Sequence, residues 1–183
     1  FSSDGLWLAT SHAGGLMRIW NVNEAKEAYP PYEGYLPKGA PFSPDNNFLA
    51  YIYSPGKNQD DIIRVVELET GNIVAELPGY LQKSFVQFRA DSKLLMMSDI
   101  YYASIWDVVT WEQADTGGGF NNIGCGQYFT PQNNLLAFVS NAGILFTNNK
   151  TDPKIEAMCK TKPKGSILAY YFYEEHQMLF VID

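Results

Sequence analysis

The sequence predicts an all-β fold built from repeated sheets, and three observations lead to this class. A motif that begins with phenylalanine occurs five times, at spacings of 41, 46, 41 and 43 residues. The leading residues are Phe1, Phe42, Phe88, Phe129 and Phe172. Short apolar runs bounded by turn residues lie between the motifs, and the content of 12 Tyr, 11 Phe and 4 Trp suits a pleated surface. A period of about 40 to 45 residues that holds strands alone is typical of β-propeller blades.

The first unit is expected to form strands at residues 6–11 and 16–21, joined by a tight connection at 12–15. Residues 29–35 follow as an irregular crossing, because the adjacent Pro30 and Pro31 exclude a central position in a sheet. The second unit is expected to form strands at 48–53, 62–68 and 73–77. Its loop from Ser54 to Asp61 is longer than the equivalent loops and explains most of the 46-residue spacing.

The later units repeat the pattern. Their expected strands are 85–88, 93–98, 103–108 and a short one near Trp111, then 125–129, 134–139, 144–147 and 155–159, then 167–172 and 178–182. Four short antiparallel strands make one blade. We therefore expect residues 1–183 to form a single propeller region, an arc of about four four-stranded antiparallel blades and a partial fifth. Since the chain begins and ends inside repeats, we interpret it as a fragment of a larger ring, truncated at both ends.

Two short motifs carry a family resemblance. Residues 42–50 read Phe-Ser-Pro-Asp followed by Leu-Ala, and residues 105–107 read Ile-Trp-Asp, with a near copy at 19–21. The units resemble tryptophan-aspartate (WD) repeats, and residues 63–71 are also similar to Tol-system-type and prolyl-oligopeptidase-type propellers. The resemblance implies a non-catalytic scaffold that binds proteins. Gly79-Tyr80 stands where the family has Gly-His, so the family's His-Ser/Thr-Trp-Asp hydrogen-bond network is not expected.

Antiparallel strands place the crossings and the second-to-third hairpins on one face of the ring. Aromatic residues gather on that face, and exposed aromatic rings are favoured in protein contacts. The expected partner-binding residues are Tyr32, Tyr35, Tyr80, Tyr101, Tyr102 and Phe120. The alternative is that most of these rings cover the cores between blades.

Other functions receive little support from the sequence. A net charge of -7 argues against general nucleic-acid binding, and no run of 18 apolar residues predicts a membrane span. His12 and His176 are expected on opposite faces, without a third ligand at zinc spacing, and no nucleophile has an activating base nearby. We expect no enzyme activity, no cofactor and no metal. Cys125 and Cys159 are expected to lie beyond disulfide reach, which favours a reducing, cytoplasmic compartment.

Two further functions stay open. The chain could be the gating propeller of a larger enzyme, such as a serine peptidase whose catalytic domain lies outside residues 1–183. A small-molecule or glycan site in the central channel is the third alternative, although residues 84–88, 125–129 and 167–172 supply no carboxylate to it. All three interpretations rest on analogy between folds.

Overall fold

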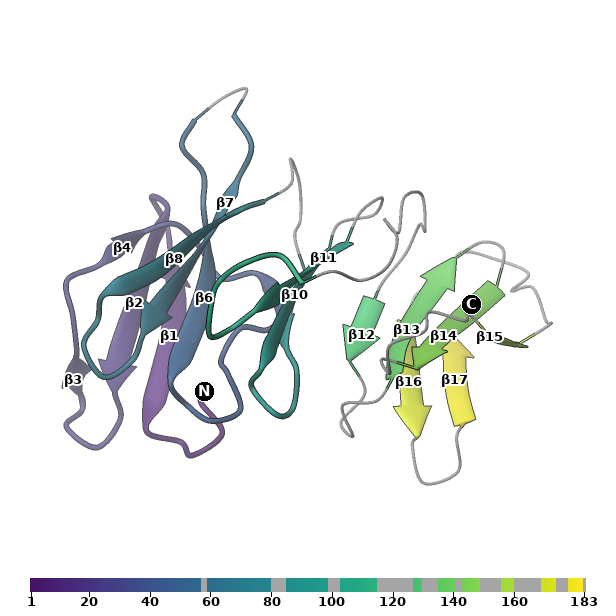
Figure 1. Cartoon of the computed structure of the whole chain (residues 1–183). Helices are drawn as coiled ribbons and strands as arrows, with labels where there is room; N and C mark the ends of the chain where they lie inside the picture. Colours follow the sequence, from purple (N-terminus) through teal and green to yellow (C-terminus); the bar gives the residue numbers. More distant parts are fainter. Residues whose placement is uncertain are drawn as a thin grey trace.

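The computed structural model of the chain is all-β and consists of consecutive, mainly antiparallel sheets (Figure 1). It describes residues 1–56, 59–79, 85–98 and 103–114, and after these only the backbone of six strands between residues 127 and 182. None of the described residues is helical. The all-β prediction is confirmed, and the described sheets do not close into a barrel or a ring.

The first sheet has a hairpin at its centre and two short strands along one edge. Strands β1 (Trp7–His12) and β2 (Leu16–Asn21) pair in antiparallel register. The other edge of β2 pairs with β3 (Lys26–Glu27) near one end and with β4 (Tyr32–Glu33) near the other. The prolines between β3 and β4 lack an N–H group, which explains why this edge carries two short strands.

The second sheet contains β6 (Phe48–Tyr53), β7 (Ile62–Glu67) and β8 (Ile73–Pro78) in sequence order. The free edge of β6 is met by the preceding segment, in which Tyr35 bridges Ile52 and Phe42 bridges Leu49. This segment takes the place of a first strand in the second unit.

The third sheet contains β9 (Phe85–Phe88), β10 (Leu94–Ser98) and β11 (Ala103–Asp107). Strand β5 (Lys38–Ala40) belongs to the same sheet and pairs in parallel with β9. The expectation of wholly antiparallel sheets is therefore wrong at this position. Because β5 lies within the segment that bridges β6, main-chain pairing links the second sheet to the third.

The fourth and fifth units also form sheets. Strands β12 (Gln127–Phe129), β13 (Leu135–Ser140), β14 (Gly143–Asn148) and β15 (Glu156–Cys159) pair in sequence order as a four-stranded antiparallel sheet. Strands β16 (Ala169–Tyr173) and β17 (Met178–Ile182) form a hairpin. Each of these strands lies within two residues of its expected bounds. Among the residues that the structure describes, no helix is long and apolar enough to cross a membrane.

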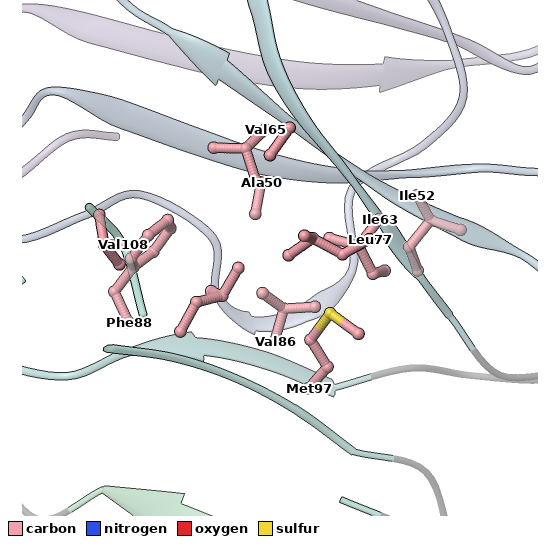
Figure 2. Packing of buried hydrophobic residues seen from close by; sticks show 11 residues of the cluster. Ala50, Ile52, Ile63, Val65, Leu77, Val86, Phe88, Met97 and Val108 are labelled. Atoms are coloured by element: carbon pink, nitrogen blue, oxygen red, sulfur yellow. The ribbon is translucent and has the colours of Figure 1, made fainter. Parts of the chain in front are cut away.

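The second sheet is buried on both faces. Successive side chains of a strand point to opposite faces, so Leu49 and Tyr51 of β6 pack against the first sheet, while Ala50 and Ile52 pack against the third. One core joins Met17 and Ile19 of β2 to the second sheet. The other core lies between the second and third sheets (Figure 2). It contains Ile63, Val65, Leu77, Val86, Phe88, Met97 and Val108, together with Ala50 and Ile52. Burial on both faces explains the nearly unbroken apolar runs of β6 and β7.

Candidate binding groove

The motif that begins with phenylalanine forms the same turn in the first three units. We call residues 2–5, 43–46 and 89–92 the Phe-led turns. In each, the N–H of the fourth residue donates to the carbonyl of the first, at 3.1, 2.9 and 2.8 Å. The aspartate of the motif accepts from a backbone N–H two residues later, and these aspartates are Asp4, Asp45 and Asp91. The recurring aspartate thus closes the turn as an Asx turn.

Consecutive Phe-led turns are hydrogen-bonded to each other. The side-chain oxygen of Asn46 accepts from the backbone N–H of Ser3 at 2.9 Å and from its hydroxyl at 2.8 Å. One unit further on, the buried Ser92 hydroxyl accepts from the backbone N–H of Asp45 at 3.0 Å. The turns of the first three units therefore form a connected row at one end of the sheets.

A second hairpin of each unit lies beside this row. We call residues 22–25, 68–71 and 108–111 the outer hairpins. The backbone N–H of Val22, Leu68 and Val108 donates to the carbonyl of Leu6, Asn47 and Lys93, which ties each outer hairpin to the Phe-led turn of its own unit. The Phe-led turns and the outer hairpins of these units therefore lie at the same end of the sheets. The last residue of each outer hairpin has a positive φ, and these residues are Ala25, Gly71 and Trp111.

The first and second sheets meet beside Gly71, where the ring of Tyr29 packs. The ring of Tyr29 stacks on Trp7 at a centroid distance of 6.3 Å, and its hydroxyl donates to the carbonyl of Leu68 at 2.7 Å. A Cβ atom on Gly71 would lie 2.4 Å from the Tyr29 ring. A glycine is needed at this position because its φ is +73° and because the ring occupies the space.

The second and third sheets meet beside Trp111, and here an open groove of about 480 Å³ remains. Trp111 contacts Phe48 edge to face, at 5.5 Å between ring centroids. Two valines of the lining are exposed: Val109, at 84%, and Val74, at 38%. The remaining lining residues are Asp45, Glu67, Asp91, Ser92, Lys93 and Val108. The groove thus has apolar walls, and its polar residues are mostly acidic.

The carboxylates of the lining differ in their surroundings. Asp91 forms an ion pair with Arg89 at 2.8 Å. Burial acts to raise the pKa of Asp91, but the hydrogen bonds from Arg89 and Lys93 outweigh it and lower that pKa. Asp45 accepts from Ser43 and Asn47, and Glu67 accepts from Thr70. These donors are neutral, so within the described residues no ion pair compensates the charge of Asp45 or Glu67.

No protein-family model and no curated protein matches the chain. A solved structure of hydrazine synthase from Kuenenia stuttgartiensis is similar, with a TM-score of 0.53 and 12% sequence identity. The match covers 81% of this chain and 51% of that chain. At this identity the likeness shows the fold alone.

Two of the six aromatic residues expected to bind a partner lie in the described part, and both are hydrogen-bonded. Tyr32 packs against Tyr51, and its hydroxyl donates to the carbonyl of Gly71 at 2.7 Å. Burial, with smaller contributions from Tyr29 and Tyr51, raises the pKa of Tyr32 to about 12. This ring belongs to the core between the first two sheets.

Tyr35 is 37% exposed, and its hydroxyl donates to Asp61 at 3.1 Å. Asp61 also accepts from Ser54, so these residues hold together the two ends of the long loop of the second unit. Tyr80, Tyr101, Tyr102 and Phe120 lie outside the described residues.

A polar network in the first sheet contains three residue types of the WD-repeat network. The indole N–H of Trp20 donates to the Thr10 hydroxyl at 2.9 Å, and that hydroxyl lies 2.8 Å from Nε2 of His12. The network lacks an aspartate, since Asn21 follows Trp20. His12 comes from the same strand as Thr10 and not from the segment before the first strand. Within the described part of the chain, no three His, Cys, Asp or Glu side chains are close enough to hold a metal ion.

None of the groove residues belongs to the six aromatic residues that were expected to bind a partner. Their signal is visible when the units are compared with one another. The second position of the outer hairpin is Asn23, Glu69 and then Val109, and the fourth is Ala25, Gly71 and then Trp111. The third unit thus has an apolar residue where the others are polar, and a large ring where the others are small.

Proposed function

We propose that the chain is part of a β-propeller that acts as a non-catalytic scaffold for binding a protein. Three features support the propeller: consecutive units form consecutive sheets, these sheets pack face to face, and β5 and β9 run parallel in successive units. The similarity to hydrazine synthase, which contains β-propeller domains, agrees with this proposal.

The observation that carries the binding function is the groove between the second and third sheets. Its walls belong to strands and short hairpins whose backbone is fixed by the hydrogen bonds of the Phe-led turns. Its rim exposes Val109 and Val74 to solvent. Exposed apolar side chains that gather around a groove are typical of an interaction site. A rigid site also binds at a lower entropic cost than a flexible one.

Site-specific photo-crosslinking in the native cells tests this function. A benzophenone amino acid replaces Val109 in the groove or Tyr35 at the opposite end of β6, and a third variant carries it at Val22. Val22 holds the first position of the outer hairpin of the first unit and is a control for nonspecific capture. We expect a defined protein adduct from Val109, from Tyr35 or from both, and none from Val22. The absence of any adduct, or equal adducts at all three positions, contradicts the proposal.

A further inference from the structure

We infer that the groove between the second and third sheets binds an extended segment of a partner protein, in which an apolar side chain stands beside a lysine or an arginine. The inference rests on the binding function proposed above. It adds the location of the site and the chemistry of its ligand.

The apolar part of the ligand is indicated by the walls of the groove. Phe48, Val74, Val108 and Trp111 supply these walls from two sheets. A volume of about 480 Å³ lies within the range of about 300–1,000 Å³ that is usual for ligand pockets. One large aliphatic or aromatic side chain, with part of its backbone, fits such a space.

The exposure of Val109 gives an independent argument. This valine is 84% exposed at the tip of its hairpin, where the first two units have Asn23 and Glu69. Val74 in the same lining is 38% exposed, so two exposed valines gather at this groove, as at surfaces that another molecule covers. The same hairpin has Trp111 at a φ of +55°, a left-handed conformation that is unfavourable for a bulky residue. Val109 and Trp111, each unusual at its position in the hairpin, both line the groove.

The charge of the ligand is indicated by Asp45 and Glu67. Both line the groove, and their partners within the described part of the chain are neutral donors. Lys93 is the cation of the lining, whereas Asp91 is already paired with Arg89. The lining therefore complements a cationic side chain, and the net charge of -7 for the whole chain favours the approach of a basic segment.

Selection from a random dodecapeptide library displayed on phage, against the immobilised protein, tests the inference. We expect the recovered peptides to share an apolar residue next to lysine or arginine. The fluorescein-labelled consensus peptide is then titrated against the protein by fluorescence anisotropy. Binding weakens at least tenfold in W111G and V109N and several-fold in E67Q, and it weakens as the salt concentration rises.

The variants are matched to the other units. W111G introduces the residue of the second unit and relieves the left-handed backbone, but it also removes the contact with Phe48. Far-ultraviolet circular dichroism and urea unfolding therefore establish that the variant is folded under the conditions of the titration. V109N introduces the residue of the first unit, and the control V22N leaves binding unchanged. Failure to recover peptides, recovery of acidic peptides, or unchanged binding to W111G and V109N overturns the inference. If a partner crosslinks at Tyr35 while these peptide results are negative, the scaffold function stands and the groove is not its site.

Discussion

Gly71 and Trp111 hold the same left-handed position in successive units, and different rings fill the space beside them. Tyr29 of the first unit lies over Gly71, whereas Trp111 contributes its own ring and contacts Phe48. Between the first and second units, the ring at this position comes from the earlier unit. Between the second and third units, it comes from the later unit. The residue at the left-handed position, glycine or tryptophan, thus differs together with the unit that supplies the ring.

Substitution of Gly71 by alanine is predicted to destabilise the protein by several kcal/mol. The left-handed backbone costs alanine about 1–2 kcal/mol, and the clash of its Cβ with the Tyr29 ring adds about 1–3 kcal/mol. Gly14→Ala is the matched control, because Gly14 has a φ of +87° but nothing within 4 Å of its Cβ position. Urea unfolding measures both changes. Equal losses in the two variants would show that Tyr29 does not occupy the space above Gly71.

A second residue-scale prediction concerns alkaline pH. The pKa of Tyr32 is raised from 10.0 to about 12, chiefly by burial. A raised folded-state pKa means that this contribution to stability is fully present below pH 10 and is lost as the pH rises toward 12. We expect Tyr32→Phe to lose less stability than the wild type between these pH values. Unfolding curves across this range, with an ultraviolet titration of tyrosinate, measure the effect. An identical pH dependence in the two proteins would contradict it.

The Phe-led turn is the element that fixes how consecutive sheets meet. It combines an aspartate that closes the turn with a left-handed residue, which is Gly5, Asn46 or Ser92. In the second and third units, side chains of the turn also bind the preceding turn. The repeat motif therefore specifies the contact between units as well as the local chain reversal.

Asn46→Ala is predicted to cost about 2 kcal/mol, because alanine tolerates the left-handed backbone poorly and cannot accept the hydrogen bonds from Ser3. Asn46→Gly keeps the backbone and loses only the hydrogen bonds, so it is expected to cost about 1 kcal/mol. Urea unfolding separates the two contributions. If the glycine variant is as stable as the wild type, the link between the first two turns does not stabilise the stack.

Strand positions were predictable from the sequence wherever an apolar run is bounded by turn residues. The bounds of β2, β6, β9 and β17 agree with expectation, because both ends of each run are marked. Strand β5 was not predictable. Lys38-Gly39-Ala40 has no apolar signature, and its partner β9 lies 47 residues further along the chain.

The groove could be predicted only in part. Val109 and Trp111 stand out when the outer hairpins of the units are aligned, but their position relative to Phe48 and Val74 depends on how two sheets pack. The aromatic residues chosen from the sequence illustrate the same limit. Tyr32 lies between sheets because β4 covers an edge of β2, and the sequence of the crossing does not reveal this pairing.

At the scale of the whole molecule, the second sheet belongs to two cores at once. Alternate side chains of β6 and β7 serve the core shared with the first sheet and the core shared with the third. Tyr51, Ile52, Ile63 and Val65 are almost fully buried as a result. Loss of either neighbouring sheet would expose one complete face of this sheet to water.

Hydrogen exchange followed by mass spectrometry tests this face-to-face arrangement of repeated sheets most directly. Amides of core strands exchange only through opening that approaches global unfolding, whereas those of edge elements exchange through local opening. Within residues 1–114, we predict that the amides of β6 and β7 exchange most slowly, and more slowly than those of β1, β2, β10 and β11. Exchange in β6 and β7 as fast as in those strands would contradict the central position of the second sheet.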